Sequence, residues 1–145
     1  MSDYEFTNDW FARDAAPVWR NLLPQIRPSR ILEVGSYEGA SACFAIESCA
    51  GERPLELHCI DTWDGGVEHQ SGGLLESDMG AVEARFHRNI EKAKLRATHP
   101  ANVIIHRGRS EGNWPVSSLK ARLAFLIFAT SMAHIRPLMY CATPF

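Results

Sequence analysis

The sequence predicts one α/β domain built around a mostly parallel sheet. Two apolar runs of strand length, residues 30–34 and 55–60, flank a segment with helical spacing at residues 40–49. Strand, glycine turn, helix and strand make a βαβ unit, and such units build parallel sheets with right-handed crossovers. The chain has 145 residues, 46% of them hydrophobic, which is enough for a core without disulfides or a structural metal.

A helix is expected before the first strand. Thr7 or Asn8 can cap it, and its apolar residues recur at helical spacing. Pro17 lies inside this pattern and predicts a kink or a restart. Pro24 and Pro28 are expected to end the helix, because a residue before proline is disfavoured in the helical conformation.

Further elements are expected after the second strand. Residues 62–80 are rich in glycine and predict a long loop, and loops of this length are usually functional or disordered. Residues 79–97 have the spacing of an amphipathic helix. A third strand at residues 103–105 ends at Gly108, and a fourth begins within residues 119–128. The inward face of the amphipathic helix is expected to consist of Val82, Phe86, Ile90 and Leu95.

Charge and hydropathy exclude several classes of function. The net charge of -2, without a clustered basic stretch, argues against nucleic acid as a partner. The longest apolar stretch, residues 123–129, is far shorter than the roughly 20 residues of a transmembrane helix, so we expect no membrane association. The first residues lack the basic-then-apolar pattern of a signal peptide, which predicts a cytoplasmic protein.

The cysteines are predicted to be free, buried thiols. No C-x-x-C pair and no histidine at zinc-finger spacing accompanies them, so we expect no zinc or other metal site. These residues are Cys43, Cys49, Cys59 and Cys141.

The segment EVGSYEGAS, residues 33–41, joins the first strand to the following helix. Two glycines there allow a tight turn and a close approach of a ligand to the backbone at a helix N-terminus. The spacing fits neither a Walker loop nor the G-x-G-x-x-G dinucleotide fingerprint. Alone, this pattern is weak support for a ligand site.

Asp61, at the end of the second strand, strengthens the interpretation. In a doubly wound sheet, an acid at this place binds the ribose hydroxyls of a nucleoside ligand at the carboxyl edge. The alternative is a tight turn next to a solvated acid at a strand end, and we consider it the less favoured interpretation.

Together these motifs resemble class I S-adenosylmethionine-dependent methyltransferases, in the branch that includes small-molecule and sugar O-methyltransferases. The likeness is carried by EVGSYEGAS, CIDTWDGGVEH, FHRNIEKA and HRGRSEG, in that order, and covers roughly residues 6–128. It implies a Rossmann-like, doubly wound, mostly parallel sheet that binds S-adenosylmethionine across its carboxyl edge. By this resemblance, Glu33, Gly35, Ser36, Gly39 and Ser41 would surround the methionine part, Asp61, Thr62 and Trp63 the ribose, and Gly108, Arg109 and Ser110 the adenine.

Two residue types near these motifs allow more than one interpretation. Trp63 can cover a ligand or belong to the core, and the sequence does not favour either role. His69 is expected to be an exposed loop residue, with a ligand or base role as the weaker alternative. The remaining histidines are expected to be structural or to lie on the surface, and these are His58, His87, His99 and His106.

After the fourth strand the sequence departs from the family's pattern. Relatives carry a motif like F-D-[FL]-I-[YF]-[VI]-D-G-S-H, whereas Phe128 is followed here by ATSMAHIRPLMYCATPF, and all 17 Asp and Glu residues lie at or before Glu111. Codons read from the third base across residues 131–143 force a Gly, a Val and a Leu, and they permit the rest of the family's motif. We therefore predict a partial methyltransferase domain over residues 1–128, with about strands 1–4 of seven, and an out-of-frame tail over residues 129–145. The coding DNA tests this hypothesis.

The predicted function is that of an S-adenosylmethionine-binding, methyltransferase-like protein. In intact relatives a methyl group would pass to a small-molecule hydroxyl; for this chain we assign no catalytic residue and expect little turnover. The alternative is a noncatalytic fragment or pseudogene product that binds at most a cofactor or a partner. An NAD-dependent reductase is disfavoured by the missing third glycine. A truncated sheet also predicts an exposed edge at the fourth strand and self-association through it.

Overall fold

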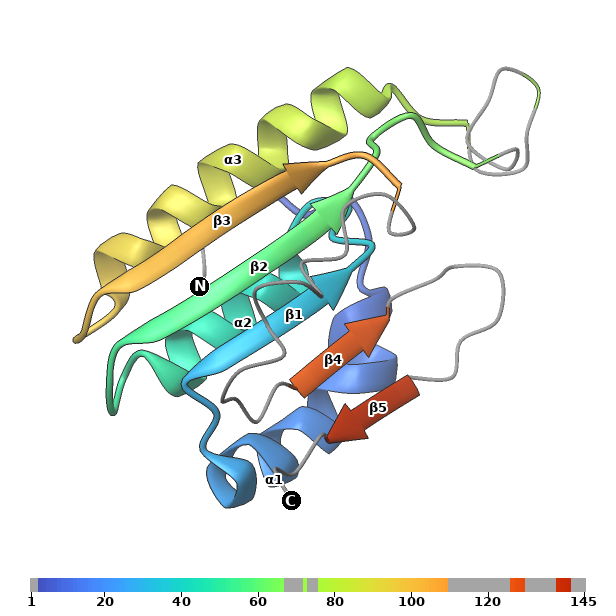
Figure 1. Ribbon diagram of the computed structural model, residues 1–145. Coiled ribbons are helices and arrows are strands. Elements are labelled where there is room, and N and C mark those ends of the chain that lie inside the picture. The colour runs from blue at the N-terminus through green and yellow to red at the C-terminus, as the bar shows by residue number, and fades with distance from the viewer. Residues whose placement is uncertain (1–2, 67–71, 73–75, 110–125, 130–137, 142–145) are drawn as a thin grey trace.

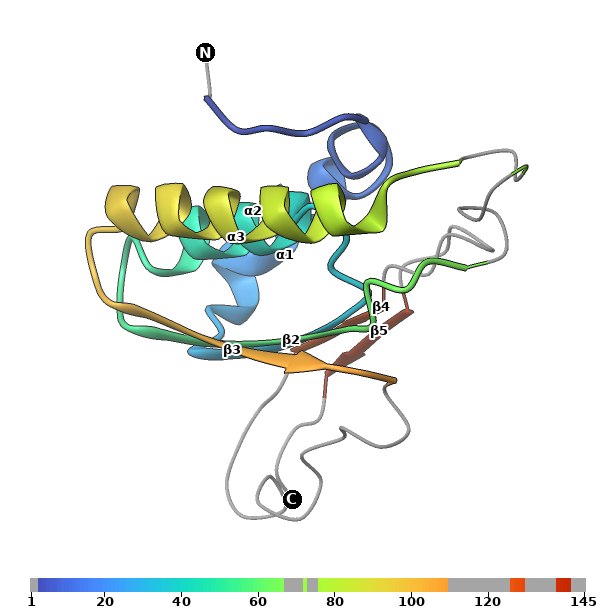
Figure 2. The same cartoon turned by 90° about the horizontal axis from the view of Figure 1, so that it is seen from above.

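The computed structural model describes residues 3–66, 72, 76–109, 126–129 and 138–141. Helices pack on one face of a five-stranded sheet (Figures 1 and 2). In chain order the elements are a π-helix η1 (Phe11–Ala15), α1 (Ala16–Ile26), β1 (Arg30–Val34), α2 (Ala40–Cys49), β2 (Leu55–Asp61), α3 (Met79–Arg96), β3 (Ala101–Arg107), β4 (Leu126–Ala129) and β5 (Leu138–Cys141).

The sheet has the strand order β3-β2-β1-β4-β5. The pairs β1–β2, β2–β3 and β1–β4 are parallel, and only β4–β5 is antiparallel among the described strands. The prediction of an α/β fold with a mostly parallel sheet is therefore confirmed. The predicted exposed edge at the fourth strand is wrong, because β5 pairs with the outer side of β4.

The strand order changes direction once. From β1 the chain moves to β2 and then to β3 on one side, and β4 then lies on the other side of β1. Residues 119–125 of the predicted fourth strand lie outside the described residues, while 126–128 are in β4 as expected. β5 lies within residues 129–145, the segment that was predicted to be an out-of-frame tail.

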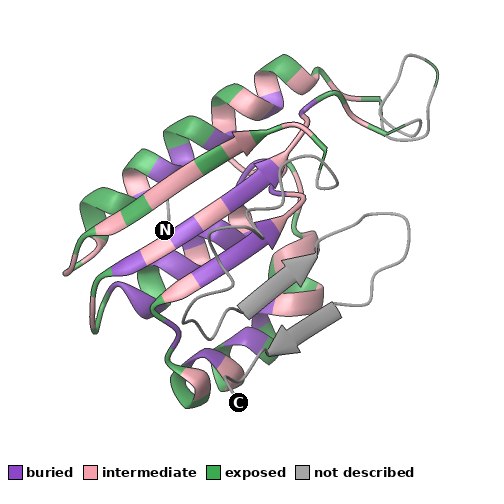
Figure 3. Cartoon of the chain, viewed as in Figure 1, coloured by how far each residue is buried: buried purple, intermediate pink, exposed green. Residues whose placement is uncertain are grey.

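The core lies between the sheet and its helix layer, where Figure 3 shows the buried residues. In register, Ile31 of β1 pairs with Leu57 of β2, and Leu57 pairs with Val103 of β3, so all three share one face of the sheet. Ile31 and Leu57 have no exposed surface. Among the described residues, Trp19 from α1 and Phe86 from α3 are the two largest fully buried side chains, and both belong to this core.

The first helix differs in part from the prediction. A restart near Pro17 is confirmed, because η1 gives way to α1 and Pro17 stands in the first turn of α1. Pro24 does not end the helix but lies inside α1, which ends before Arg27 in the left-handed conformation. Burial of Leu23 and partial burial of Ile26 on either side of Pro24 offset its one missing hydrogen bond.

Neither Thr7 nor Asn8 caps this helix. The residue before η1 is Trp10, without a side-chain cap, and Asn8 only accepts a hydrogen bond from the Trp10 N–H at 3.2 Å. The Thr7 hydroxyl instead donates to Glu38, far away in the sequence. A long-range polar partner has therefore displaced the expected local cap.

The α3 helix confirms three of its four predicted inward residues. Val82, Phe86 and Ile90 are buried, whereas Leu95 is 86% exposed. Leu95 follows Ile90 by five positions, which turns it about 140° away around the helix. The helix begins at Met79 with Asp78 as its cap, whose Oδ1 accepts from the Ala81 N–H at 3.1 Å.

The N-terminal arm, residues 3–9, runs over the helix layer on the side away from the sheet (Figure 2). Its aromatic residues Tyr4 and Phe6 stack on each other at 5.2 Å between ring centroids and pack against the core. The guanidinium of Arg96, in the last turn of α3, lies 4.6 Å from the centre of the Tyr4 ring.

Among the described residues, no helix combines the length and the apolar character that a membrane span needs.

Candidate functional site

The predicted site residues gather at the carboxyl edge of the sheet. Here β1 leads into residues 35–39, which we call the glycine loop, and β2 ends at Asp61. Backbone hydrogen bonds hold the strand ends in line: the Gly35 N–H donates to the Ile60 carbonyl at 2.9 Å, and the Gly108 N–H to the Asp61 carbonyl at 2.8 Å. The ends of β1, β2 and β3 therefore form one continuous edge.

The carboxylate of Asp61 organises the glycine loop. Its Oδ2 accepts hydrogen bonds from the backbone N–H groups of Ser36 at 2.7 Å and Tyr37 at 2.9 Å. Its Oδ1 accepts from the N–H of Trp63 at 2.8 Å. The two motifs that the sequence suggested separately are thus joined by direct contacts.

These contacts limit what else Asp61 can bind. A carboxylate offers about four lone-pair positions, and three are already directed at backbone N–H groups. One further donor, such as a single hydroxyl, fits without change. The prediction that Asp61 holds two ribose hydroxyls needs one of these N–H groups to share its acceptor or to release it.

Beneath the loop lies a buried acid, Glu33, which is 1% exposed. Ser36 donates its hydroxyl to Glu33 Oε2 at 2.6 Å, and the Ser41 hydroxyl donates to Oε1. Burial raises the pKa of Glu33, and the two hydroxyl hydrogen bonds offset part of this rise. The side chains of Glu33, Ser36 and Ser41 therefore hold one another and shape the loop from below.

Gly39 is required by both its conformation and its surroundings. Its φ of 81° lies in the left-handed region, and it caps α2. A Cβ atom at this position would stand 2.9 Å from Cδ2 of Phe86 and 3.3 Å from Cε2 of the same ring. The loop can approach α3 this closely only with glycine here.

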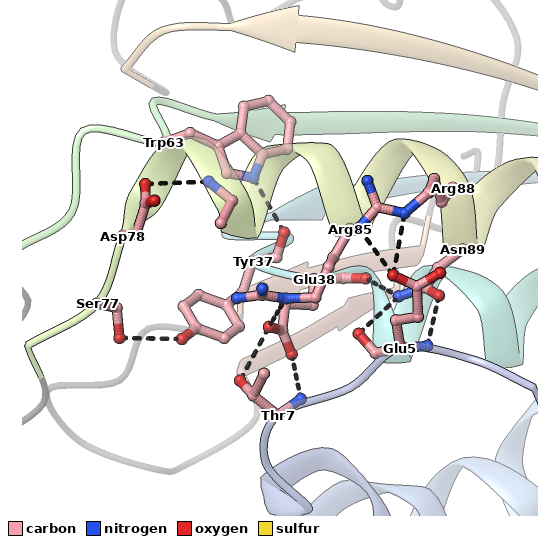
Figure 4. Close-up of polar contacts among 11 residues, drawn as sticks. Glu5, Thr7, Tyr37, Glu38, Trp63, Ser77, Asp78, Arg85, Arg88 and Asn89 are labelled. Carbon is pink, nitrogen blue, oxygen red and sulfur yellow. Dashed lines mark hydrogen bonds and ion pairs between the residues drawn. The ribbon is translucent and has the colours of Figure 1, made fainter.

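Two residues without glycine's freedom also adopt the left-handed conformation at this edge. Tyr37 has φ 49° and Trp63 has φ 48°, and the Trp63 indole Nε1–H donates to the Tyr37 carbonyl at 2.9 Å (Figure 4). Such residues keep this conformation only when their surroundings fix it. A hydrogen bond thus joins the two residues whose backbone is strained, Tyr37 and Trp63.

Trp63 is a core residue, which answers a question that the sequence left open. It is 2% exposed and packs on Phe86 at 4.9 Å between ring centroids. Its side chain therefore contributes to the site through packing and through its bond to Tyr37.

The remaining predicted site residues lie nearby or outside the described part. The Thr62 hydroxyl accepts from the Asp64 N–H at 3.1 Å, and Arg109 is exposed after Gly108. Ser110 and His69 lie outside the described residues.

Two of the described histidines contact each other, and the described cysteines are buried. His58 Nδ1 lies 2.9 Å from His106 Nε2, and its Nε2 lies 3.2 Å from Glu56, so a histidine pair that the sequence did not suggest links β2 to β3. Burial and the neighbouring His58 lower the pKa of His106. Free buried thiols are confirmed for Cys43, Cys49 and Cys59, while the Cys141 side chain is not described.

Within the described segments, no group of three or more His, Cys, Asp or Glu side chains is arranged to hold a metal ion.

Sequence reasoning missed a buried acid in the glycine loop, Glu38, which is 2% exposed. Its carboxylate accepts from the Thr7 N–H at 2.7 Å, the Thr7 hydroxyl at 2.9 Å and Arg85 Nε at 2.6 Å (Figure 4). No local pattern signals these partners, which come from the N-terminal arm and from α3. The one available signal is that Glu38 is an acid placed between the two glycines of the loop.

A cavity of about 140 Å³ lies between α1 and α2. Three arginines contribute to its wall, Arg20, Arg27 and Arg53, and Glu52 forms an ion pair with Arg27 at 2.8 Å. None of its lining residues belongs to the predicted site, so this cavity does not bear on the chemistry at the sheet edge.

Comparison with models of known protein families found no match, and comparison with curated proteins found no relative. The family suggested by the sequence motifs therefore stays a prediction.

Proposed function

We propose that this chain is a methyltransferase-like protein that binds S-adenosylmethionine at the carboxyl edge of a Rossmann-like, doubly wound sheet. The strand order supports this proposal, because it reverses between β1 and β4. In open parallel sheets, ligands bind outside the carboxyl ends of the strands at such a reversal. The glycine loop follows β1 and lies at this point.

The observation that carries the proposal is the contact between Asp61 and the glycine loop. A carboxylate at the end of β2 accepts hydrogen bonds from the loop that follows β1, at 2.7 Å from Ser36 N and 2.9 Å from Tyr37 N. Asp61, which we expect to bind the ribose, and the glycine loop, which we expect to bind the methionine part, are therefore in direct contact at the carboxyl edge of the sheet.

The residues present fit such a cofactor at three points. Gly35 has a positive φ and no side chain, which favours a close approach of a ligand to the backbone there. The first turn of α2 directs its N–H groups toward the same edge, where a carboxylate of the ligand would be favoured. Asp61 keeps one acceptor position for a hydroxyl donor.

S-adenosylmethionine supplies an activated methyl group, which in intact relatives would go to a small-molecule hydroxyl. In this chain the glycine loop would hold its amino-acid end, Asp61 a ribose hydroxyl, and Gly108 with Arg109 would border the base. Removing the hydroxyl proton requires a base or a metal. We assign neither among the described residues, so our proposal is cofactor binding with little turnover.

A noncatalytic role is the second candidate. It is favoured because the polar groups of the site already have partners within the protein. Ser36 and Ser41 donate to Glu33. Asp61 accepts from three backbone N–H groups. A fragment that keeps this cluster only for stability would show the same contacts without binding any cofactor.

Titration calorimetry with S-adenosylmethionine and, separately, with NAD tests the proposal. We expect saturable heat from S-adenosylmethionine and none from NAD. Asp61→Asn should weaken binding at least about tenfold, because an amide keeps one acceptor oxygen and places an N–H₂ donor against a backbone N–H. Asp64→Asn, at an exposed acid three positions on, is the matched control and should bind as wild type does.

The outcomes separate the candidates. Heat from neither ligand would favour the noncatalytic fragment, and heat from NAD would favour a reductase. Equal affinity of the Asp61 and Asp64 variants for S-adenosylmethionine would place the cofactor elsewhere on the chain.

A further inference from the structure

The N-terminal arm is fastened to the glycine loop through a buried charge. Glu38 lies in the middle of that loop, and its carboxylate is enclosed by the arm residue Thr7 and by Arg85 of α3 (Figure 4). The Glu38 side chain is 2% exposed, and that of Arg85 is 22% exposed. A carboxylate this deeply buried is stable only while its partners stay in place, so arm, loop and helix are held as a unit.

The backbone of the same residue is held from the other side. The carbonyl of Glu38 accepts from Asn89 Nδ2 at 3.0 Å. Asn89, with no exposed surface, also accepts from the Glu5 N–H at 2.8 Å through its Oδ1 and donates to the Glu5 carbonyl at 3.3 Å. The buried side-chain amide of Asn89 thus binds the backbone of the arm and the backbone of the loop at the same time.

Ion pairs on the outside complete the attachment. The Glu5 carboxylate pairs with Arg88 at 2.7 Å and with Lys92 at 3.0 Å, both on the outer side of α3. The Lys92 Nζ also donates to the Asp3 carbonyl at 2.8 Å. The arm therefore follows α3 for several turns, with polar contacts at each.

The strain in the glycine loop explains why this attachment matters. Glu38 stands between Tyr37 and Gly39, and both of these are in the left-handed conformation. Tyr37 adopts it at a cost that the surroundings must offset. Its N–H and that of Ser36 are the groups that bond to Asp61. Fixing Glu38 therefore fixes the two amides that define the candidate site.

We propose that the N-terminal arm is a strap that positions the glycine loop, with Glu38 as the positioning residue that transmits its hold. Thr7 and Asn89 set the place of Glu38, and Glu38 sets the orientation of Ser36 and Tyr37 toward Asp61. A further step, that the strap thereby raises affinity for S-adenosylmethionine, rests on the proposed function.

Amide hydrogen exchange measures the first step without any ligand. Thr7→Val removes one hydrogen bond to a buried charge and keeps the shape of the side chain. We expect the Ser36 and Tyr37 amides to exchange about tenfold faster or more, while amides inside β2 keep their wild-type rates. Thr7→Ser keeps the hydroxyl and should restore wild-type exchange.

Two charge variants provide a matched comparison. Glu5→Gln removes the outer ion pairs of the strap, and Glu52→Gln removes the exposed pair with Arg27, which lies away from the loop. We expect faster exchange of the loop amides in the first variant, to a smaller extent than in Thr7→Val, and no change in the second.

Several results would overturn the proposal. Loop amides that keep their wild-type rates in Thr7→Val would show that the arm does not position the loop. Equal acceleration of all amides, β2 included, would show a general loss of stability, and so would a failure of Thr7→Ser to restore the rates.

Calorimetry with S-adenosylmethionine on the same variants tests the second step. We expect affinity to fall in the order of the exchange rates, with Thr7→Val weakest and Thr7→Ser equal to wild type. If wild type gives no heat, the proposed function fails, while the exchange result still decides whether the arm positions the loop. If all variants bind alike despite faster exchange, the link between strap and cofactor is wrong.

Discussion

Replacing Gly39 by alanine should destabilise the protein through two separable effects. The backbone has φ 81°, which costs an L-residue about 1–2 kcal/mol. The new Cβ would also stand 2.9 Å from Phe86 Cδ2, a contact that forces the buried ring to move. Overpacking of this kind costs about 1–3 kcal/mol. Together we expect Gly39→Ala to lower the free energy of unfolding by about 2–5 kcal/mol.

Gly72→Ala is the matched control for the backbone effect. Gly72 has φ 83°, almost the same as Gly39, but a Cβ there would meet no atom of the described residues within 4 Å. We expect a loss of about 1–2 kcal/mol from this variant. The difference between the two variants measures the steric part alone.

A double-mutant cycle then tests whether Phe86 is the obstacle. Phe86→Val removes the δ carbons of the ring, so Gly39→Ala should cost only its backbone part in that background. Urea unfolding followed by far-UV circular dichroism gives the four free energies. The reasoning is refuted if Gly39→Ala costs no more than Gly72→Ala, or if its cost stays the same when Phe86 is valine.

Three further predictions concern titratable groups. Burial raises the pKa of Glu33 above its ordinary 4.5, so its contribution to stability is present below pH 4.5 and is lost as pH rises through the folded-state pKa. Urea unfolding should therefore show the stability of Glu33→Gln gaining on that of wild type as pH rises above 4.5. Arg88 and then Lys92 lower the pKa of Glu5 to about 2, so the advantage of wild type over Glu5→Gln should be present above pH 4.5 and vanish as pH falls through 2. Burial raises the pKa of Cys49 to about 11, so this thiol should react with Ellman's reagent at pH 8 on the order of 100-fold more slowly in the native than in the denatured protein. Equal pH profiles of wild type and variant, or a fast native thiol reaction at this cysteine, would contradict them.

The sequence predicted the βαβ unit because its signals are local. An apolar run, two glycines and a helical pattern lie side by side, and the bounds of β1 and α2 agree with the residues expected, 30–34 and 40–49. The place of Asp61 at the end of β2 follows from the same pattern. Local periodicity and turn chemistry suffice for these elements.

The errors occur where distant contacts decide. Thr7 looks like a helix cap, but the buried carboxylate of Glu38 offers its hydroxyl and its N–H a stronger, charge-assisted partner. Pro24 looks like a helix end, but packing of the residues around it keeps α1 intact. Leu95 is apolar and still exposed, since the helix face is set by what packs against it.

Within the candidate site, the contacts between the residues that the sequence suggested could not be predicted. Glu33, Ser36 and Ser41 were expected to surround the methionine part of a ligand, and this stays a prediction. The structure shows that the two serines donate to Glu33 beneath the loop. No spacing rule distinguishes a side chain that faces a ligand from one that supports the loop. That distinction depends on burial, which only the folded arrangement provides.

The attachment of the N-terminal arm also sets an order of events during synthesis. Residues 3–7 leave the ribosome well before their partners Arg88, Asn89 and Lys92, which follow more than 70 positions later. At about 5–20 residues per second, the arm waits for some seconds before α3 exists. The glycine loop is made during that interval, before Arg85 and Asn89, which help to fix Glu38. The arm is therefore made before α3 but can take its place only after α3, and the candidate site becomes ordered only when α3 has been translated.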